Sequence, residues 1–278
     1  MRQPKPKRKQ SLMDNDDTHI NYQLKDATER LTRISNIPDG VSGLRSGFKN
    51  LDKITFGWQA GDLVVISARP AMGKTAFVTS MLLNMGAKEK YPVGIFSLEL
   101  TNTHLTNRLI SNICGISGEK LVSGMLAEYE WAQLDYKIKE LKDTPIYIEC
   151  PHTLSIQSLC AKTRKMVSDY GIKAVFVDYL QLLTVTDKYT DNRYNEINYI
   201  SRELKALAKE LNITVFAVSQ MNRGNESRTG AEGKRPILTD LRDSGTLCDD
   251  ADIVCFIHRP EYYNIIEDEK RNLIWGIS

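Results

Sequence analysis

From Leu63 onward the sequence alternates short apolar runs with helical patterns, and this alternation constrains the fold more than any other feature. Most of the runs are rich in β-branched residues and lack polar alternation, as is typical of strands buried on both faces. They span residues 63–67, 93–98, 146–149, 174–178, 214–219 and 253–257, with helical patterns such as 75–87 and 194–211 between them. Strands alternating with helices predict an α/β fold with a mainly parallel, twisted sheet flanked by helices.

The segment after the first strand matches a phosphate-binding loop. Residues 68–75 fit the pattern G-x-x-x-x-G-K-[ST], except that Ala68 stands in place of the first glycine. In such a loop, backbone N–H groups and a helix N-terminus bind phosphate groups. We expect Lys74 to reach the β- and γ-phosphates, Thr75 to ligate Mg²⁺, and Gly73 to allow close backbone approach. The predicted phosphate-binding residues are Arg69, Pro70, Ala71, Met72, Gly73, Lys74, Thr75 and Ala76.

Polar residues end three of the other predicted strands. Glu99 follows 93–98, Asp178 ends 174–178, and Gln220 follows 214–219. Because ligands gather at the carboxyl ends of strands in open α/β sheets, we expect these side chains near the phosphate loop. Asp178 is placed to hold Mg²⁺, Glu99 to act as the base for an attacking water, and Gln220 to hydrogen-bond the γ-phosphate.

Length and composition favour one main domain. The chain has 278 residues, of which 41% are hydrophobic, enough for one large core. No apolar run approaches the roughly 18–20 residues of a membrane span, and the basic N-terminus has no apolar stretch typical of a secretory signal. The five cysteines form no CxxC pair. We therefore expect reduced thiols and a cytoplasmic protein that does not contact membranes.

The N-terminal region divides into two parts. Residues 1–17 run from basic to acidic with almost nothing apolar, which predicts a disordered tail. Apolar residues then recur at spacings of four, three, four and three, at Ile20, Leu24, Ala27, Leu31 and Ile34. This seam predicts one short helix within 18–37, ending before Pro38. Its partner is either the surface of its own domain or a neighbouring subunit.

Several motifs together resemble a known family. The runs SARPAMGKTAF, FSLEL, VDYLQLL, SQMNR and KRPILTDLRDSGTLCDDADIVCFIHRPEYY are similar to the RecA-like ATPase domain of DnaB-type replicative DNA helicases. The resemblance covers roughly residues 20–263. It implies a linker helix at 18–37, which docks on an adjacent subunit, and a RecA-like P-loop NTPase domain over 38–278.

The resemblance also implies roles for individual residues. Lys74 and Thr75 match the family's P-loop pair, Glu99 its catalytic glutamate, Asp178 its Walker B aspartate and Gln220 its γ-phosphate sensor. The residues implied to contact DNA are Arg242, Asp243 (where the family usually has glutamate) and Gly245, together with Arg223. A basic stretch agrees with this assignment, since Arg223, Arg228, Lys234, Arg235 and Arg242 are interleaved with glycines. Taken alone, that stretch fits a solvated loop equally well.

Proteins of this family form hexameric rings that hydrolyse ATP with Mg²⁺ and move 5′–3′ along single-stranded DNA in replication. The resemblance therefore implies ATP, Mg²⁺, single-stranded DNA and further copies of this chain as ligands and partners, with a primase and a helicase loader as others. The family continues past the EYY segment into a Lys-x-Arg-Asn-Gly motif whose arginine reaches the neighbouring site. This chain ends at NLIWGIS. We accordingly expect a C-terminally incomplete domain with slow hydrolysis.

Two other functions stay open at this point. The chain fits a RecA-like ATPase of another kind, such as a recombinase or a clock-type ATPase, although its LTDLRDSG and HRPEYY motifs disfavour this. It also fits a non-catalytic fragment that associates with rings of a full-length helicase. An unwinding assay distinguishes the first alternative from a helicase, and steady-state ATP hydrolysis distinguishes the second from an active motor.

Overall fold

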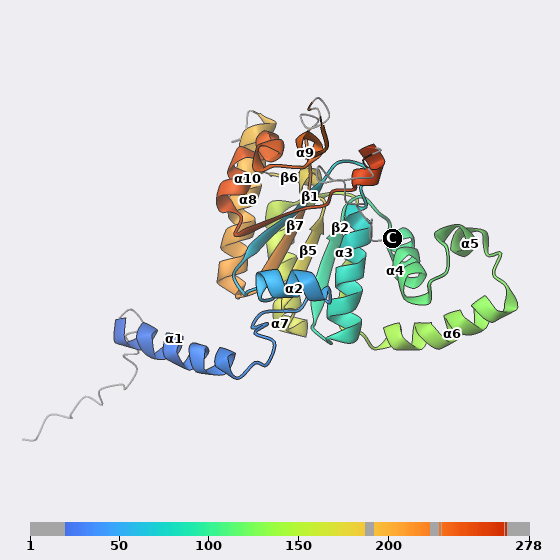
Figure 1. Cartoon of the computed structure of the whole chain (residues 1–278), viewed down its shortest axis with the longest axis horizontal. Coiled ribbons are helices and arrows are strands. Elements are labelled where there is room, and N and C mark those ends of the chain that lie inside the picture. Colours follow the sequence, from blue (N-terminus) through green and yellow to red (C-terminus); the bar gives the residue numbers. More distant parts are fainter. Residues whose placement is uncertain (1–19, 187–191, 223–227, 229, 264, 266–278) are drawn as a thin grey trace, which may run out of the picture.

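The structure is a computed structural model that describes residues 20–186, 192–222, 228, 230–263 and 265 (Figure 1). The predicted tail at 1–17, the predicted DNA contact Arg223 and the segment 266–278 lie outside the described residues. Within the described part of the chain, no helix combines the length and the apolar character needed to cross a membrane. Cysteines at all five positions are free thiols.

A six-stranded sheet forms the centre of the fold, with the strand order β3-β2-β5-β7-β1-β8. Every neighbouring pair in it is parallel, which confirms the predicted α/β architecture. The strands are β1 (Leu63–Ala68), β2 (Val93–Ser97), β3 (Ile146–Glu149), β5 (Ala174–Asp178), β7 (Thr214–Gln220) and β8 (Ile253–Phe256). All six predicted strands are present, with ends shifted by at most one residue. A separate parallel pair joins β4 (Leu154–Ser155) to β6 (Leu183–Thr184).

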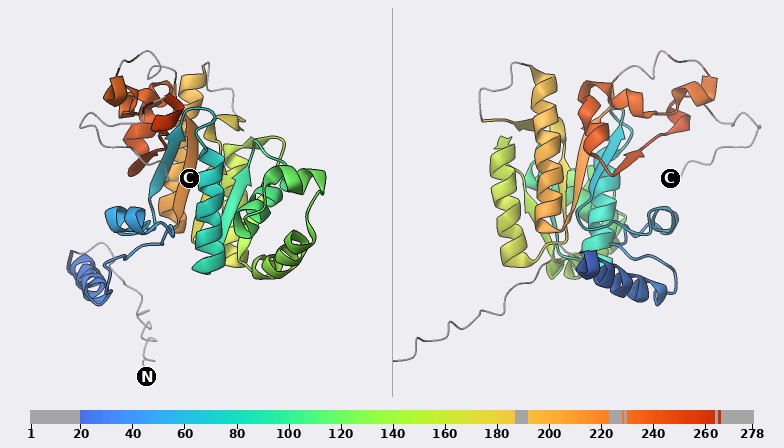
Figure 2. Two further views of the ribbon diagram at one scale, coloured as in Figure 1. Left: turned by 45° about the vertical axis from the view of Figure 1, so that its right-hand side comes forward. Right: turned by 90° about the vertical axis from the view of Figure 1, so that its left-hand side faces the viewer.

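Alternate residues of each central strand feed two separate apolar cores. In β1, Leu63 and Val65 pack in one core, whereas Val64 and Ile66 pack in the other. Helices α7 (Ile156–Tyr170) and α8 (Arg193–Leu211) cover the first face. Helices α3 (Lys74–Leu83) and α4 (Asn102–Cys114) cover the second (Figure 2). Because both faces are covered, the strands are apolar without alternation, as the sequence indicates.

The helix after the phosphate loop differs from its prediction at the C-terminal end. It was expected to span 75–87, but α3 ends at Leu83 and continues as a π-helical turn, η1 (Asn84–Lys88). The Asn84 side chain is buried there and donates a hydrogen bond to the Ser46 carbonyl at 3.2 Å. A wider turn at this point accommodates the buried polar contact.

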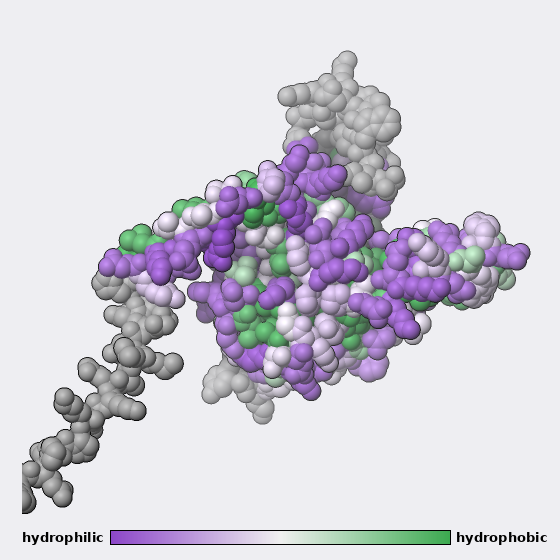
Figure 3. Space-filling model, turned by 90° about the horizontal axis from the view of Figure 1, so that it is seen from below, coloured by the Kyte–Doolittle hydropathy of each residue, from purple (hydrophilic) through white to green (hydrophobic). Residues whose placement is uncertain are grey.

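Helix α1 (Ile20–Ser35) projects from the body of the molecule (Figures 1 and 2). None of its residues is buried, and Leu24 and Leu31 are 57% and 66% exposed. Seen from below, apolar side chains alternate with hydrophilic ones along this arm (Figure 3). A hydrogen bond of 3.2 Å from Arg30 to Gln59 links the helix to the domain. The apolar seam predicted for this helix therefore faces solvent in the isolated chain.

The remaining elements lie at the periphery of the sheet. They are α2 (Lys49–Thr55), α5 (Gly118–Ser123), α6 (Glu128–Lys142), η2 (Leu180–Leu182), α9 (Gly230–Lys234), η4 (Leu238–Ser244), α10 (Gly245–Asp250) and η5 (Pro260–Tyr263). Helices α5 and α6 form a second arm on the side opposite α1 (Figure 1).

Candidate nucleotide-binding site

Four adjacent strands end at the candidate site. In the order β2-β5-β7-β1, they lead to Glu99, Asp178, Gln220 and the phosphate loop at 68–75. The strand register sets the four ends close together: Ser97 pairs with Asp178 and Ala68 with Gln220, and β7 and β1 extend about two residues further than β5, because Val177 pairs with Ala217. Sequence reasoning placed these residues at one sheet edge, and the topology brings them to neighbouring strands.

The phosphate loop has the backbone conformation of a tight turn before a helix. Gly73 has a φ of +94° and is the N-cap of α3, which starts at Lys74. A β-carbon added to Gly73 would meet no protein atom within 4 Å, so the space in front of the loop is open for a ligand. The loop also holds Ala71 at a φ of +63°. The first backbone N–H groups of α3 are therefore available to bind an anion.

The Lys74 ammonium group is turned back onto the loop itself. Its Nζ donates to the carbonyl of Ala68 at 3.1 Å and to the carbonyl of Arg69 at 3.3 Å. Burial lowers the pKa of Lys74, whereas the negative charges of Asp178 and Glu99 raise it. A phosphate group would add negative charge beside this amine and favour its protonated form.

Asp178 is the most deeply buried carboxylate of the site, with 1% of its surface exposed. Both of its oxygens lack a hydrogen-bond partner among the described residues. Burial raises the pKa of Asp178 above 3.8, and the negative charge of Glu99 raises it further. The nearby Thr75 hydroxyl lowers this pKa, although it makes no well-aligned hydrogen bond to the carboxylate. Unpartnered buried oxygens are costly, and a cation is the partner that such a carboxylate lacks. The pair of Asp178 and Thr75 therefore fits Mg²⁺, with the phosphates of a nucleotide as further ligands.

Glu99 and Gln220 are both exposed at the open edge of the site. Their position at strand ends leaves their side chains accessible to a bound ligand. The Gln181 side chain contacts the end of β7: its Nε2 donates to Ser219 Oγ at 2.8 Å, and its Oε1 accepts from the backbone N–H of Gln220 at 3.4 Å. Sequence reasoning missed Gln181. The available signal was a polar residue within the apolar run that follows Asp178.

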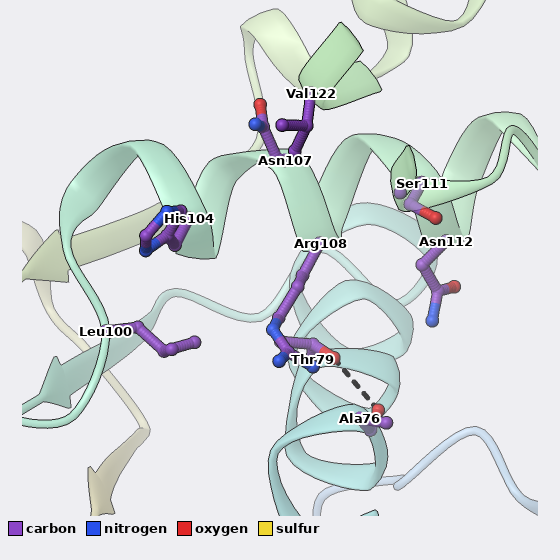
Figure 4. A pocket seen from close by; sticks show the side chains of 10 residues that line it. Ala76, Thr79, Leu100, His104, Asn107, Arg108, Ser111, Asn112 and Val122 are labelled. Carbon is purple, nitrogen blue, oxygen red and sulfur yellow. Dashed lines mark hydrogen bonds between the residues drawn. The ribbon is translucent and has the colours of Figure 1, made fainter. Parts of the chain in front are cut away.

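A hollow of about 550 Å³ lies beside the phosphate loop, between α3, α4 and α5. Arg108 extends from α4 toward Thr79 and Ala76 of α3, whereas His104 lies nearer Leu100 (Figure 4). The positive charge of Arg108 also lowers the pKa of Asp178, as a weaker cause than burial. Sequence reasoning missed Arg108 as well, because its proximity depends on how α4 packs on α3.

The described residues that are expected to contact DNA lie between β7 and β8 in the chain. The structure places Arg242 and Asp243 in η4, and Gly245 at the first position of α10. Within the basic stretch, Arg228 pairs with the buried Asp240 at 2.5 Å. This arginine therefore has a structural contact that a freely solvated basic loop would not show.

Comparison with known proteins identifies relatives over most of the chain. The family model "DnaB-like helicase C terminal domain" matches residues 43–276. The replicative DNA helicase DnaC of Bacillus subtilis is 37% identical over 246 residues, covering 88% of this chain and 53% of that protein. The replicative DNA helicase DnaB of Rickettsia bellii is 40% identical over 256 residues, covering 88% and 51%. The chain thus spans about half the length of these curated relatives.

Solved structures show the same fold. The "ATPase Domain of G40P" superposes with a TM-score of 0.82 at 36% identity, covering 92% of this chain and 89% of that one. A DnaB-like replicative helicase, described with its interactions with primase, gives a TM-score of 0.79 at 36% identity, covering 90% and 59%. The RecA-like fold class expected from the resemblance is confirmed.

Proposed function

The chain belongs to the family of DnaB-like helicase C-terminal domains, and from this premise we propose that it is the ATP-hydrolysing motor of a replicative DNA helicase. One observation carries the proposal. Three polar residues and a phosphate loop end four adjacent parallel strands, and the buried carboxylate among them lacks a partner within the described residues.

Each residue then has a distinct task in the proposed reaction. Bound ATP·Mg²⁺ supplies the phosphoanhydride bond that is broken. Lys74 and the N–H groups at the start of α3 bind the phosphates, while Asp178 and Thr75 hold the cation. Glu99 orients and deprotonates the attacking water, and Gln220 hydrogen-bonds the γ-phosphate. The backbone of 69–76 supplies the phosphate cradle.

We further propose that η4 and the start of α10 bind single-stranded DNA through Arg242, Asp243 and Gly245. Phosphate contacts of this kind carry no sequence preference, which suits a motor that tracks along a strand. The chain is proposed to work as a hexameric ring, with α1 docking on the adjacent subunit and movement in the 5′–3′ direction. The exposed apolar seam of α1 supports this docking. A primase and a helicase loader are the further proposed partners, in the cytoplasm where DNA is replicated.

Two duplex substrates test the proposal, one with a 5′ single-stranded tail and the other with a 3′ single-stranded tail. Unwinding that requires ATP and the 5′ tail supports it, as does ATP hydrolysis stimulated by single-stranded DNA. A chain that binds ATP but neither hydrolyses it nor responds to DNA would instead be a non-catalytic, ring-associating module. Strand exchange between homologous duplexes without unwinding would place it among recombinases.

A further inference from the structure

The carbonyl oxygen of Ala68 accepts two hydrogen bonds from different parts of the chain. Lys74 Nζ donates to it at 3.1 Å, and the Met221 amide donates to it at 3.2 Å. Lys74 also donates to the Arg69 carbonyl at 3.3 Å. A phosphate that binds the Lys74 ammonium competes with both carbonyls for its protons. The ammonium has three N–H donors, two of which these carbonyls accept, so a phosphate that takes more than the third weakens the hydrogen bonding of the backbone at 68–69.

The side chain of Arg69 ties this same backbone to the residues that follow β7. It is almost completely buried. Its Nη1 donates to the carbonyl of Met221 at 3.1 Å and to the carbonyl of Asn222 at 3.3 Å. The Met221 N–H in turn donates to the Ala68 carbonyl. Residues 221–222 and the phosphate loop therefore each donate hydrogen bonds to the other. A planar guanidinium offers several fixed donors and retains its charge when buried.

The hydrogen bonds continue from Asn222 to η4. The Asn222 amide donates to the backbone carbonyl of Asp240 at 3.1 Å. The Asp240 carboxylate is buried and accepts from the Ile237 amide at 2.9 Å and from Arg228 at 2.5 Å. Asp240 is thereby fixed within η4, the helix that also contains Arg242 and Asp243.

We propose that Arg69 is a positioning residue that transmits phosphate binding at Lys74 to η4 and so sets the affinity for single-stranded DNA. The inference rests on the proposed function, because DNA is the ligand assigned there to η4. A ligand shifts a second site only through contacts that differ between the two states. The Lys74–carbonyl bonds are such contacts, and Arg69 connects their backbone to residues 221–222.

Two measurements on the full 278-residue chain test this role. Hydrogen exchange is recorded for residues 68–80 and 237–244 with and without a non-hydrolysable ATP analogue and Mg²⁺. Affinity for a fluorescent oligothymidylate is measured under the same two conditions. In the wild type, the analogue alters exchange in both segments and changes DNA affinity by about 5- to 150-fold, the usual range of coupling between sites. In Arg69→Met at saturating analogue, hydrogen exchange still changes at residues 68–80 but not at 237–244. The affinity ratio, which is the DNA affinity with the analogue divided by that without it, falls toward one.

Two further variants make the test specific. Arg164→Met removes an exposed ion pair with Glu210 on another part of the surface, and its affinity ratio stays at the wild-type value. Arg69→Lys keeps a cation but replaces the fork with a compact ammonium, so its ratio is also reduced. An unchanged ratio in whichever Arg69 variants fold overturns the inference. A wild type that responds at 68–80 but not at 237–244 overturns the coupling alone, whereas no response at 68–80 overturns the nucleotide site as well.

Discussion

Ser97 and Asp178 lie opposite each other at the last paired position of the β2–β5 ladder, and the Leu98 amide donates to the Asp178 carbonyl at 2.7 Å. This pairing fixes the backbone of Asp178, whose carboxylate has no hydrogen-bond partner among the described residues. A functional group is thus held in an unfavourable environment by the surrounding sheet.

Asp178→Asn should raise the stability of the ligand-free protein, because a neutral amide is less costly to bury than a carboxylate. Because the pKa of Asp178 is raised in the folded state, its carboxyl keeps a proton there at pH values at which the unfolded state has lost it. The contribution of Asp178 to the free energy of unfolding therefore falls as pH rises from about 3.8 through the folded-state pKa. Denaturant unfolding should show a gain on the order of 1 kcal/mol at pH 7 and a smaller gain at pH 4.5.

Asp178→Asn should also lose the additional thermal stabilisation that Mg²⁺ gives to the ADP-bound protein. Thermal unfolding with ADP alone and with ADP plus Mg²⁺ gives the measurement, and the wild type should be stabilised further by the cation. If Asp178→Asn keeps the full Mg²⁺-dependent shift, this carboxylate does not hold the metal.

Gly57→Ala should destabilise the fold by about 3 kcal/mol, the sum of left-handed strain and a backbone clash. Gly57 has a φ of +77°, and an added β-carbon would lie 2.6 Å from the carbonyl carbon of Gly43. Gly124 is the matched control, since it has a φ of +71° but nothing within 4 Å. Gly124→Ala should cost only about 1 kcal/mol. Equal losses in chemical denaturation would show that the close approach at Gly57 contributes nothing.

Arg242→Ala should weaken binding to unrelated single strands by a similar factor, because a phosphate contact carries no sequence information. The slope of log K against log salt should shrink by roughly 0.7, the value for one phosphate contact on a single strand. Fluorescence anisotropy on oligomers of different sequence supplies both quantities. A loss confined to one sequence would point to contact with a base instead.

Leu24→Ser combined with Leu31→Ser should lower the mass of the assembly in sedimentation velocity, because the two leucines belong to the exposed apolar seam of α1. Asp26→Ser with Arg33→Ser alters the opposite face of the same helix and serves as the control. Equal assembly by both double variants would remove α1 from the interface.

The sequence predicts much of this fold because its strands are continuous apolar runs, and polar residues end or follow three of them at the site. The site residues Asp178 and Gln220 follow from that pattern. The contacts of Arg69 could not be predicted, since its loop position indicates only backbone binding to phosphate, whereas its side chain meets residues more than 150 positions away. Arg108 depends likewise on helix packing. The π-helical turn after α3 coincides with a buried contact between Asn84 and Ser46, which no local periodicity indicates.

Comparison of Lys74→Ala with Glu99→Gln tests the central claim most directly. Affinity for a fluorescent ATP analogue and single-turnover hydrolysis, with protein in excess over labelled ATP, are measured for both variants and the wild type. Lys74 binds phosphate in the ground state, whereas Glu99 acts only on the attacking water. We expect Lys74→Ala to lose ATP binding, and Glu99→Gln to bind ATP normally while hydrolysis falls by at least about 100-fold. Hydrolysis at the wild-type rate in Glu99→Gln, or undiminished ATP affinity in Lys74→Ala, would contradict the account.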